Sequence, residues 1–383
     1  MNRPISLLIV STTLDSGGAE RFASTLLANI DRKKVQPELV VLRDKLGYPL
    51  PDDVGVHQLG HQRDWDTART VFRLRKLLNK RKPDVVLSNI TATNIVTGMA
   101  IRQTLDRPRW IARVGNSPRL HDSLLKSWGA TFVYPRADKI VANSVGLTDE
   151  LRDRYCRLSG RITTIANPTD LQELAQQSTR PQPHPRRCNG PLLIAVGRLC
   201  QQKRYDLMLN AFAQVRQQVL AELWICGDGP LHGQLSQRIR KLNLTNSVRM
   251  LGFCRNPHSL MAQADLFLMT SDHEGSPNAL IEAQVLGIPA VATRCPYGPE
   301  EIIVEGKTGL LSPVGEAGTF ADAVLDALQA KDLLTCTSAY EQVRQRFDAN
   351  QRVRQWEDLI CQTVTATLST PVEDPAVLQA QSP

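Results

Sequence analysis

The chain has 383 residues, of which 42% are hydrophobic, so it can bury a large core, and its length favours two domains over one. The apolar run Ile5–Val10 is too short for a signal-peptide core, and no stretch approaches 18 uncharged apolar residues, so the sequence predicts a protein that does not cross a membrane. Eight cysteines without a C-x-x-C pair indicate a reducing, cytoplasmic environment.

Positive charge is concentrated in the first half of the chain. Residues 1–180 hold 28 Lys and Arg against 18 acidic residues, within a total net charge of +8. The segment at 68–82, ARTVFRLRKLLNKRK, could lie on an anionic bilayer or on nucleic acid, or it could be a helix that covers a sheet and exposes a basic face. The asymmetry of the whole half favours an acidic partner, and we expect a peripheral protein at the inner face of the membrane.

The first half alternates short apolar runs with amphipathic segments. The expected strands are ISLLIVS, ELVVL, DVVLS, RWIAR, KIVANS and RITTIAN, and the first expected helix runs from Ala19 to Ile30. This pattern predicts a doubly wound α/β domain over residues 1–176. The proline-containing stretch at 177–190 has no apolar period and is predicted to be a linker.

The same alternation restarts in the second half. The expected strands are PLLIAVG, AELWICG, SVRML, ADLFLMT, IPAVAT and GLLSP, which predict a second parallel-sheet domain over 191–340. A helix at 341–368 is expected to cross back to the first domain, and 369–383 to form a flexible tail. Two such domains should face a central cleft, with ligands at the carboxyl ends of the strands.

Two glutamates flank a predicted strand-to-helix junction in SDHEGSPNALIEA. Glu274 and Glu282 have seven residues between them; Ser276 suits the N-cap and Pro277 the first helical position. Glu274 would then precede the helix, whereas Glu282 would lie two turns into it.

This layout suits a sugar nucleotide. A diphosphate could lie against the free N–H groups at Asn278 and Ala279, while the carboxylates accept hydrogen bonds from sugar hydroxyls. Two glutamates near a helix start could equally do no more than complement the helix dipole. The surrounding string distinguishes these interpretations.

That string resembles the signature of retaining glycosyltransferases of family four, S-x-x-E-G-x-P-x-x-x-x-E-A. The matching residues are Ser271, Glu274, Gly275, Pro277, Glu282 and Ala283. The resemblance extends over roughly residues 5 to 365. It implies the GT-B fold, with two Rossmann-like domains, and implies that Glu274 contacts the transferred sugar and Glu282 the ribose. Ser276 stands where the family usually has an aromatic residue, so donor-sugar packing is expected to differ.

Two cations follow the first strand of the second domain. Gly197-Arg198 ends this strand and Lys203 follows, which resembles the family's G-R-L and Q-K strings. Arg198 and Lys203 could clamp a diphosphate and stabilise charge on the leaving group, or they could be a solvated Arg and a helix-start Lys.

Other strings resemble family loops more weakly. Gly17-Gly18 lies between the first strand and helix, where family members approach the donor diphosphate or the acceptor. Phe253-Cys254 resembles a loop beside the base, although turns of this kind are often architectural.

The acceptor side departs from the family pattern. Many members carry a histidine near the reacting sugar, whereas this chain has Arg113-Val114-Gly115-Asn116 at the matching strand end. Arg113 or Asn116 could supply the missing hydrogen bonds, and Ser144 could touch the acceptor. His121, a few residues on, suits a solvated or capping role.

The resemblance implies transfer of a sugar from a UDP-sugar to a polyprenyl-diphosphate-linked or other glycan acceptor, with retention of configuration. The string ATRCPYGPEEII resembles the branch that transfers N-acetylhexosamines in surface-glycan or lipid-linked oligosaccharide synthesis. No His, Cys and Asp cluster has metal-ligand spacing, so we expect a metal-independent enzyme without a cofactor.

Two alternatives stay open. One is a sugar-nucleotide epimerase or hydrolase on the same fold. The other is a non-catalytic polyanion binder that uses the basic half. Binding to nucleic acid predicts aromatic residues interleaved with cations, yet aromatics make up only 5% of the chain, so we expect no nucleic-acid partner.

Overall fold

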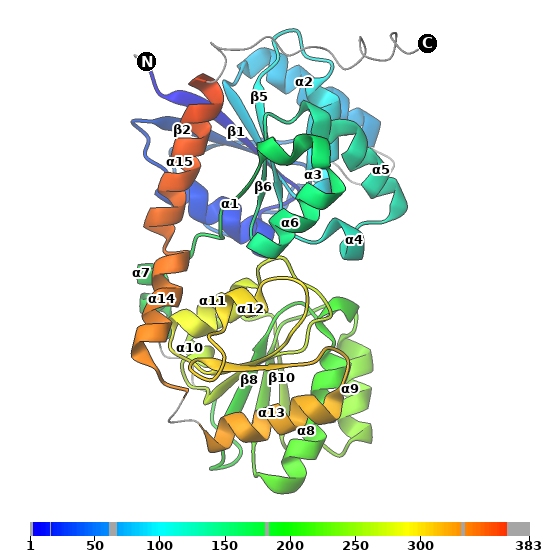
Figure 1. Ribbon diagram of the computed structural model, residues 1–383, viewed down its shortest axis with the longest axis vertical. Helices are drawn as coiled ribbons and strands as arrows, with labels where there is room; N and C mark the ends of the chain where they lie inside the picture. The colour runs from blue at the N-terminus through cyan, green and yellow to red at the C-terminus, as the bar shows by residue number, and fades with distance from the viewer. Residues whose placement is uncertain (1–2, 16, 61–66, 181–183, 331–333, 366–383) are drawn as a thin grey trace.

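The computed structural model describes residues 3–15, 17–60, 67–180, 184–330 and 334–365, which form two lobes stacked along the long axis of the molecule (Figure 1). The expected tail at 369–383 lies outside the described residues. Each lobe contains a parallel β-sheet with helices on both faces. The α/β class predicted from the sequence is therefore confirmed.

The first sheet has seven described strands in the order β3-β2-β1-β4-β5-β6-β7. They are β1 (Ile5–Ser11), β2 (Val35–Val41), β3 (Gly55–Gln58), β4 (Val85–Asn89), β5 (Arg109–Val114), β6 (Lys139–Ala142) and β7 (Ile162–Thr164). Its helices are α1 (Gly18–Asn29), α2 (Thr67–Arg81), α3 (Thr91–Ile101), α4 (Pro118–His121), α5 (Leu124–Val133) and α6 (Val145–Arg154). The strands are apolar runs because both faces of the sheet are covered.

The second sheet has six described strands in the order β10-β9-β8-β11-β12-β13. They are β8 (Leu192–Val196), β9 (Glu222–Cys226), β10 (Val248–Gly252), β11 (Leu266–Met269), β12 (Ala290–Thr293) and β13 (Gly309–Ser312). Its helices are α8 (Tyr205–Gln218), α9 (His232–Lys241), α10 (His258–Met261), α11 (Asn278–Val285), α12 (Pro299–Ile302) and α13 (Ala317–Gln329). In both sheets the strand order reverses beside the first strand, which is where doubly wound folds bind ligands.

The chain crosses between the lobes twice along one side (Figure 1). The first crossing leads to α7 (Leu171–Ser178), whose Leu174 packs in the core of the second lobe. Only the last two residues of α7 fall in the predicted linker at 177–190, and the others fall in the stretch assigned to the first domain. The second crossing leads from α14 (Thr337–Phe347) to α15 (Ala349–Thr365), and Trp356 of α15 packs on Phe22 of α1 with ring centroids 5.2 Å apart.

The predicted C-terminal helix is thus two helices rather than one. The break falls at Asp348, where Thr169 donates its N–H to the carbonyl of Phe347 (2.8 Å) and accepts from the N–H of Ala349 (2.9 Å). These bonds to the first crossing replace intrahelical ones and turn the chain. Helix α14 consequently belongs to the second lobe and α15 to the first.

Candidate active site between the two domains

Helix α11 begins where the loop after β11 meets the first lobe. The sequence predicted Ser276 as its N-cap, which is wrong by one residue: Pro277 takes that position, and its carbonyl accepts the N–H groups of Leu280 and Ile281 (both 3.1 Å). The N–H groups of Asn278 and Ala279 precede the first intrahelical bond, so they lie at the positive end of the helix.

Glu274 lies in this loop and forms an ion pair with Lys203. The ammonium Nζ is 2.5 Å from the carboxylate Oε1, and the carboxylate is largely buried. Burial lowers the pKa of Lys203, but the Glu274 carboxylate outweighs it, so the pKa lies above the ordinary value of 10.5. Lys203 is therefore a fixed cation beside the helix start.

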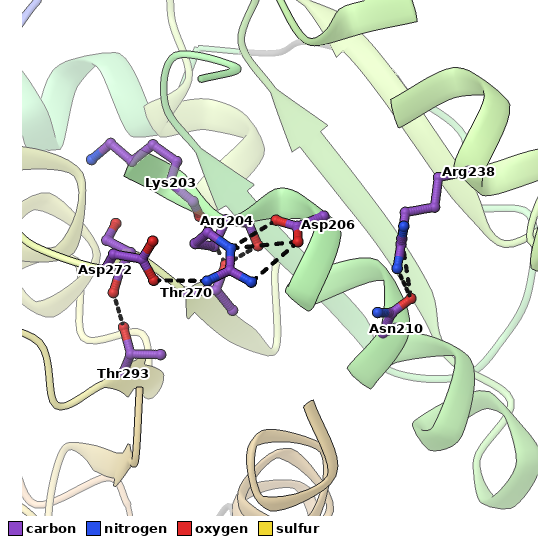
Figure 2. A network of polar contacts seen from close by, with 9 residues as sticks. Lys203, Arg204, Asp206, Asn210, Arg238, Thr270, Asp272 and Thr293 are labelled. Carbon is purple, nitrogen blue, oxygen red and sulfur yellow. Dashed lines mark hydrogen bonds and ion pairs between the residues drawn. The ribbon is translucent and has the colours of Figure 1, made fainter. Parts of the chain in front are cut away.

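A polar network holds Lys203 in this position. Arg204, next in the chain, donates to Asp206 (3.1 Å) and to Asp272 (3.0 Å), while the hydroxyl of Thr270 donates to the carbonyl of Lys203 (2.9 Å) (Figure 2). Figure 2 shows the Lys203 side chain extending away from this network. The contacts join the loop after β8 to the loop after β11, so two strand ends form one rigid unit.

The remaining second-lobe residues line the same edge. Arg198 is exposed and its side chain makes no hydrogen bond or ion pair within the described ranges, so its guanidinium can reach a ligand. Gly197 precedes it, and a Cβ at Gly227 would lie only 1.9 Å from the Gly197 carbonyl oxygen, which explains the glycine at 227. Phe253 is 63% exposed, as suits a ring that stacks on a base, and Cys254 is half-buried.

Glu282 is buried and holds two partners that the sequence did not reveal. Arg21 of α1 lies 2.9 Å from its Oε1, and His258 of α10 lies 3.1 Å from its Oε2. Burial raises the pKa of Glu282, but Arg21 and His258 outweigh it and the pKa falls below 4.5. The ion pair with Arg21 joins the two lobes directly. A carboxylate has about four acceptor positions, so free ones remain for hydroxyl groups.

Acidification is expected to loosen this interdomain joint. Because the pKa of Glu282 is lowered in the folded protein, the stability that its charge contributes is fully present above about pH 4.5. This contribution is lost as the pH falls through the lowered pKa. At neutral pH, Glu282→Gln should lower the free energy of unfolding by about 1–3 kcal/mol, since Arg21 loses its counter-charge. Thermal melting of both proteins across acidic pH measures this. If the difference in melting temperature between the two proteins persisted below the lowered pKa, it would not come from the charge of Glu282.

The first lobe meets the start of α11 through its glycine loop. The side-chain amide of Asn278 donates to the Gly18 carbonyl (3.3 Å), so Gly18 lies beside the helix start. A contact of this loop with the donor diphosphate or the acceptor stays a prediction. Gly17 has φ +148, and a Cβ there would lie 2.5 Å from the Glu20 carboxylate. A glycine is therefore needed to let the chain turn into α1.

Arg113 lies inside the first lobe rather than on its surface. Its guanidinium donates to Asn89 and to Asn167 (both 2.6 Å) and stacks 4.1 Å above the ring of Phe22. Burial lowers its pKa to about 9, with Glu20 opposing, so it is still charged at neutral pH. A direct contact with the acceptor stays a prediction for this residue.

The Arg113 network continues into the second lobe. The side-chain amide of Asn167 donates to Asn278 Oδ1 (2.7 Å), so Asn89, Arg113, Asn167 and Asn278 form a chain of hydrogen bonds between the lobes. In the sequence, the only indication of this chain of hydrogen bonds was the Asn167-Pro168 string at the end of an expected strand. The polar chain orients the first residue of α11 from the first lobe.

The other two acceptor-side predictions fall on the same edge of the first sheet. Asn116 is half-buried in the loop after β5, and its Oδ1 accepts the N–H of Ser117 (3.1 Å). Ser144 is the N-cap of α6 and its hydroxyl accepts the N–H of Leu147. Capping thus occupies Ser144 Oγ, whereas Asn116 keeps its amide group available.

Two other features are absent from the described ranges. No group of three or more His, Cys, Asp and Glu could hold a metal ion there. No helix in those ranges is both long and apolar enough to cross a bilayer.

Solved structures share this architecture. HepE of Anabaena in complex with UDP-glucose has a TM-score of 0.76 and 21% identity, covering 94% of this chain and 100% of that one. At such identity the likeness establishes the fold alone. The two-domain GT-B fold predicted from the sequence is confirmed.

Two family models match consecutive parts of the chain. Residues 16–173 match the family described as Glycosyltransferase Family 4, and residues 176–351 match Glycosyl transferases group 1. Together they span well over half of the sequence, and the chain belongs to the glycosyltransferases that carry these two domains.

Two curated relatives are similar over most of their length. The N-acetylgalactosamine-N,N'-diacetylbacillosaminyl-diphospho-undecaprenol 4-alpha-N-acetylgalactosaminyltransferase of Campylobacter jejuni is 27% identical, over 79% of this chain and 84% of that protein. The lipopolysaccharide core biosynthesis glycosyltransferase LpsE of Rhizobium meliloti is 25% identical, over 83% and 88%. These relatives are glycosyltransferases whose names place them in lipid-linked glycan and lipopolysaccharide synthesis.

Proposed function

We propose that this protein is a retaining glycosyltransferase that moves an N-acetylhexosamine from a UDP-sugar onto a hydroxyl of a polyprenyl-diphosphate-linked or other glycan acceptor. The names of the Campylobacter and Rhizobium relatives support the acceptor class and a role in surface-glycan synthesis. UDP and UDP-glucose complexes of the Anabaena neighbour support the donor class. The reaction uses no metal and no cofactor in this proposal.

One observation carries the proposal: the start of α11 lies between Glu274 and Glu282, with Lys203 2.5 Å from Glu274 and Arg198 free at the neighbouring strand end. A diphosphate at this start would accept the N–H groups of Asn278 and Ala279. Lys203 would then divide its charge between Glu274 and the phosphate.

These residues divide the work of the reaction. Arg198 and Lys203 stabilise the negative charge that develops on the departing diphosphate, and the helix start adds its dipole. Glu274 accepts hydrogen bonds from hydroxyls of the transferred sugar, and Glu282 from those of the ribose. The acceptor hydroxyl attacks from the face that the diphosphate leaves, and the leaving phosphate takes its proton. Both substituents then end on the same face, which is retention.

The first lobe would receive the acceptor at a membrane surface. Helix α2 exposes Arg69, Lys76 and Lys80, which would attract the anionic inner leaflet. In this proposal the protein is cytoplasmic and peripheral. The loop after β5, with Asn116, would face the acceptor sugar.

A transfer assay tests this proposal. The protein is incubated with a panel of UDP-sugars and a polyprenyl-diphosphate-linked N-acetylhexosamine, and the product is identified by mass spectrometry and its anomeric configuration by NMR. We expect one added N-acetylhexosamine whose anomeric configuration equals that of the donor. Release of free sugar without transfer would identify a hydrolase, conversion of the donor into another UDP-sugar would identify an epimerase, and an inverted product would exclude retention.

A further inference from the structure

The outer side of α5 carries a stripe of apolar side chains that nothing in the described structure covers. Leu124, Leu125, Trp128 and Phe132 are 82%, 86%, 78% and 54% exposed. Spacings of three, four, seven and eight residues place them on one helical face. We call this set the α5 stripe. Four large apolar side chains exposed together on one short helix mark an interaction surface.

Close packing on the opposite side holds α5 firmly on α3. A Cβ at Gly98 of α3 would lie 2.6 Å from the Val133 Cβ, and one at Gly129 of α5 would lie 2.9 Å from Ile95. The two glycines therefore let the helices approach closely. Ala130 and Val133 fill the inner side, so the core does not need the outer stripe.

Positive charge surrounds the α5 stripe. Lys126 of α5 is exposed, and the exposed Arg102 holds its guanidinium 5.0 Å from the ring centre of Phe132. The guanidinium of Arg136 lies 6.0 Å from the same ring centre. An apolar face that carries Trp, Phe and Leu beside Lys and Arg is the chemistry of helices that lie in the interface of anionic bilayers.

The size of the α5 stripe also favours a bilayer over a second copy of the chain. Ten residues of helix extend about 15 Å. A stable protein interface buries about 800 Å² on each partner, which is more than four side chains on one such helix can supply. A bilayer requires no matching surface, because the stripe inserts among lipids.

The position of α5 connects this surface to the candidate active site. Strand β5 ends at Val114, Asn116 follows, and α4 and α5 come directly afterwards. Figure 1 shows α4 at the side of the first lobe that faces the second lobe, with α5 beside it on the outside of the molecule. The stripe therefore begins close to the edge where the acceptor would bind.

We propose that α5 inserts Leu124, Leu125, Trp128 and Phe132 into the interfacial region of an anionic bilayer, with the surrounding cations on its headgroups. This contact would hold the loop after β5 against the membrane, where a lipid-linked acceptor is embedded. The contact between α5 and the bilayer does not depend on the proposed function. The delivery of the acceptor to the active site does rest on the proposed function. Helix α2 would add charge, whereas α5 supplies the apolar contact.

Co-sedimentation of the full chain with vesicles tests the insertion. Vesicles of equal parts phosphatidylcholine and phosphatidylglycerol should bind the protein, and phosphatidylcholine alone should bind it more weakly. The double variant Leu125→Glu and Trp128→Glu should lower the partition coefficient by about tenfold or more. The control is Leu220→Glu, which places one glutamate at an exposed leucine of the second lobe and should leave vesicle binding unchanged.

Tryptophan fluorescence locates the contact. The chain has five tryptophans, and Trp65 lies outside the described residues, so every protein in this assay carries Trp65→Phe. Of the others, Trp128 is exposed, whereas Trp110, Trp224 and Trp356 are buried, so quenching by bromine-labelled lipid should disappear when Trp128→Phe is added. Unchanged vesicle binding in the double variant, or quenching that persists in Trp128→Phe, would overturn the proposal. Dissociation of a dimer by the double variant, with vesicle binding intact, would instead assign the α5 stripe to self-association.

Two acceptors separate this inference from the proposed function. With an acceptor embedded in vesicles, the double variant should transfer sugar at least tenfold more slowly than the unmodified protein; with a short-chain, water-soluble acceptor the two should be equal. If the double variant lost transfer activity equally with both acceptors, the delivery role of α5 would be overturned. Normal vesicle binding without transfer to either acceptor by the unmodified protein would refute the proposed function and leave the bilayer contact standing.

Discussion

Replacement of Lys203 by alanine is expected to lower kcat for sugar transfer by about 100- to 1000-fold, the effect of removing a group that stabilises developing negative charge. Lys203 is a half-buried cation held beside the helix start by the Arg204 network and by Glu274. Steady-state kinetics with the UDP-sugar donor measure the loss. Circular dichroism shows whether the variant is folded.

Two further variants separate charge from geometry at this position. Lys203→Arg keeps the cation but presents a wider planar group, so partial activity is expected. Lys241→Ala removes an exposed lysine of α9 and should leave kcat unchanged. If folded Lys203→Ala retained full kcat, Lys203 would be a structural partner of Glu274 and would not act on the leaving group.

Gly275→Ala is expected to lower kcat/KM by about 100-fold, because it forces the lobes apart. A Cβ at this position would lie 2.1 Å from the carbonyl oxygen of Gly115 in the first lobe, and backbone on both sides leaves no flexible side chain to yield. Misplacing the reacting groups by about 1 Å can lower the rate of an enzymatic reaction by this factor. Steady-state kinetics should show slower sugar transfer, and small-angle scattering should show a more extended protein.

The matched control for this substitution is Gly233→Ala on α9, where the added Cβ has no atom within 4 Å. It should leave both activity and scattering unchanged. Full activity in Gly275→Ala would mean that transfer does not require the close approach of Gly275 and Gly115.

Local patterns predicted most of the fold because the strands are buried on both faces and read as apolar runs. Strand β3 escaped prediction, since Gly55–Gln58 is short and only partly covered. The break at Asp348 also escaped, because Thr169 causes it through backbone bonds from a distant segment. A helical period cannot reveal a partner that lies elsewhere in the sequence.

The candidate site was predicted in part for the same reason. The motif placed Glu274, Glu282 and Lys203 at strand and helix ends, because each position follows from a local pattern. Arg21 was missed, since its contact with Glu282 arises only when the lobes meet. His258 was missed because it reaches Glu282 from another helix of the same lobe, α10. Arg113 was expected near the acceptor, yet a charged residue inside a strand can also be buried when Asn89 and Asn167 accept its hydrogen bonds.

In the proposed reaction, fixed positive groups of the second lobe hold the donor diphosphate at the start of α11. Calorimetric titration of the unmodified protein and Arg198→Ala with UDP and with uridine tests it most directly, because the two ligands differ only in the diphosphate. We expect Arg198→Ala to weaken the binding of UDP by about tenfold or more and to leave the binding of uridine unchanged. Equal affinity of both proteins for UDP, or an equal loss for uridine, would contradict it.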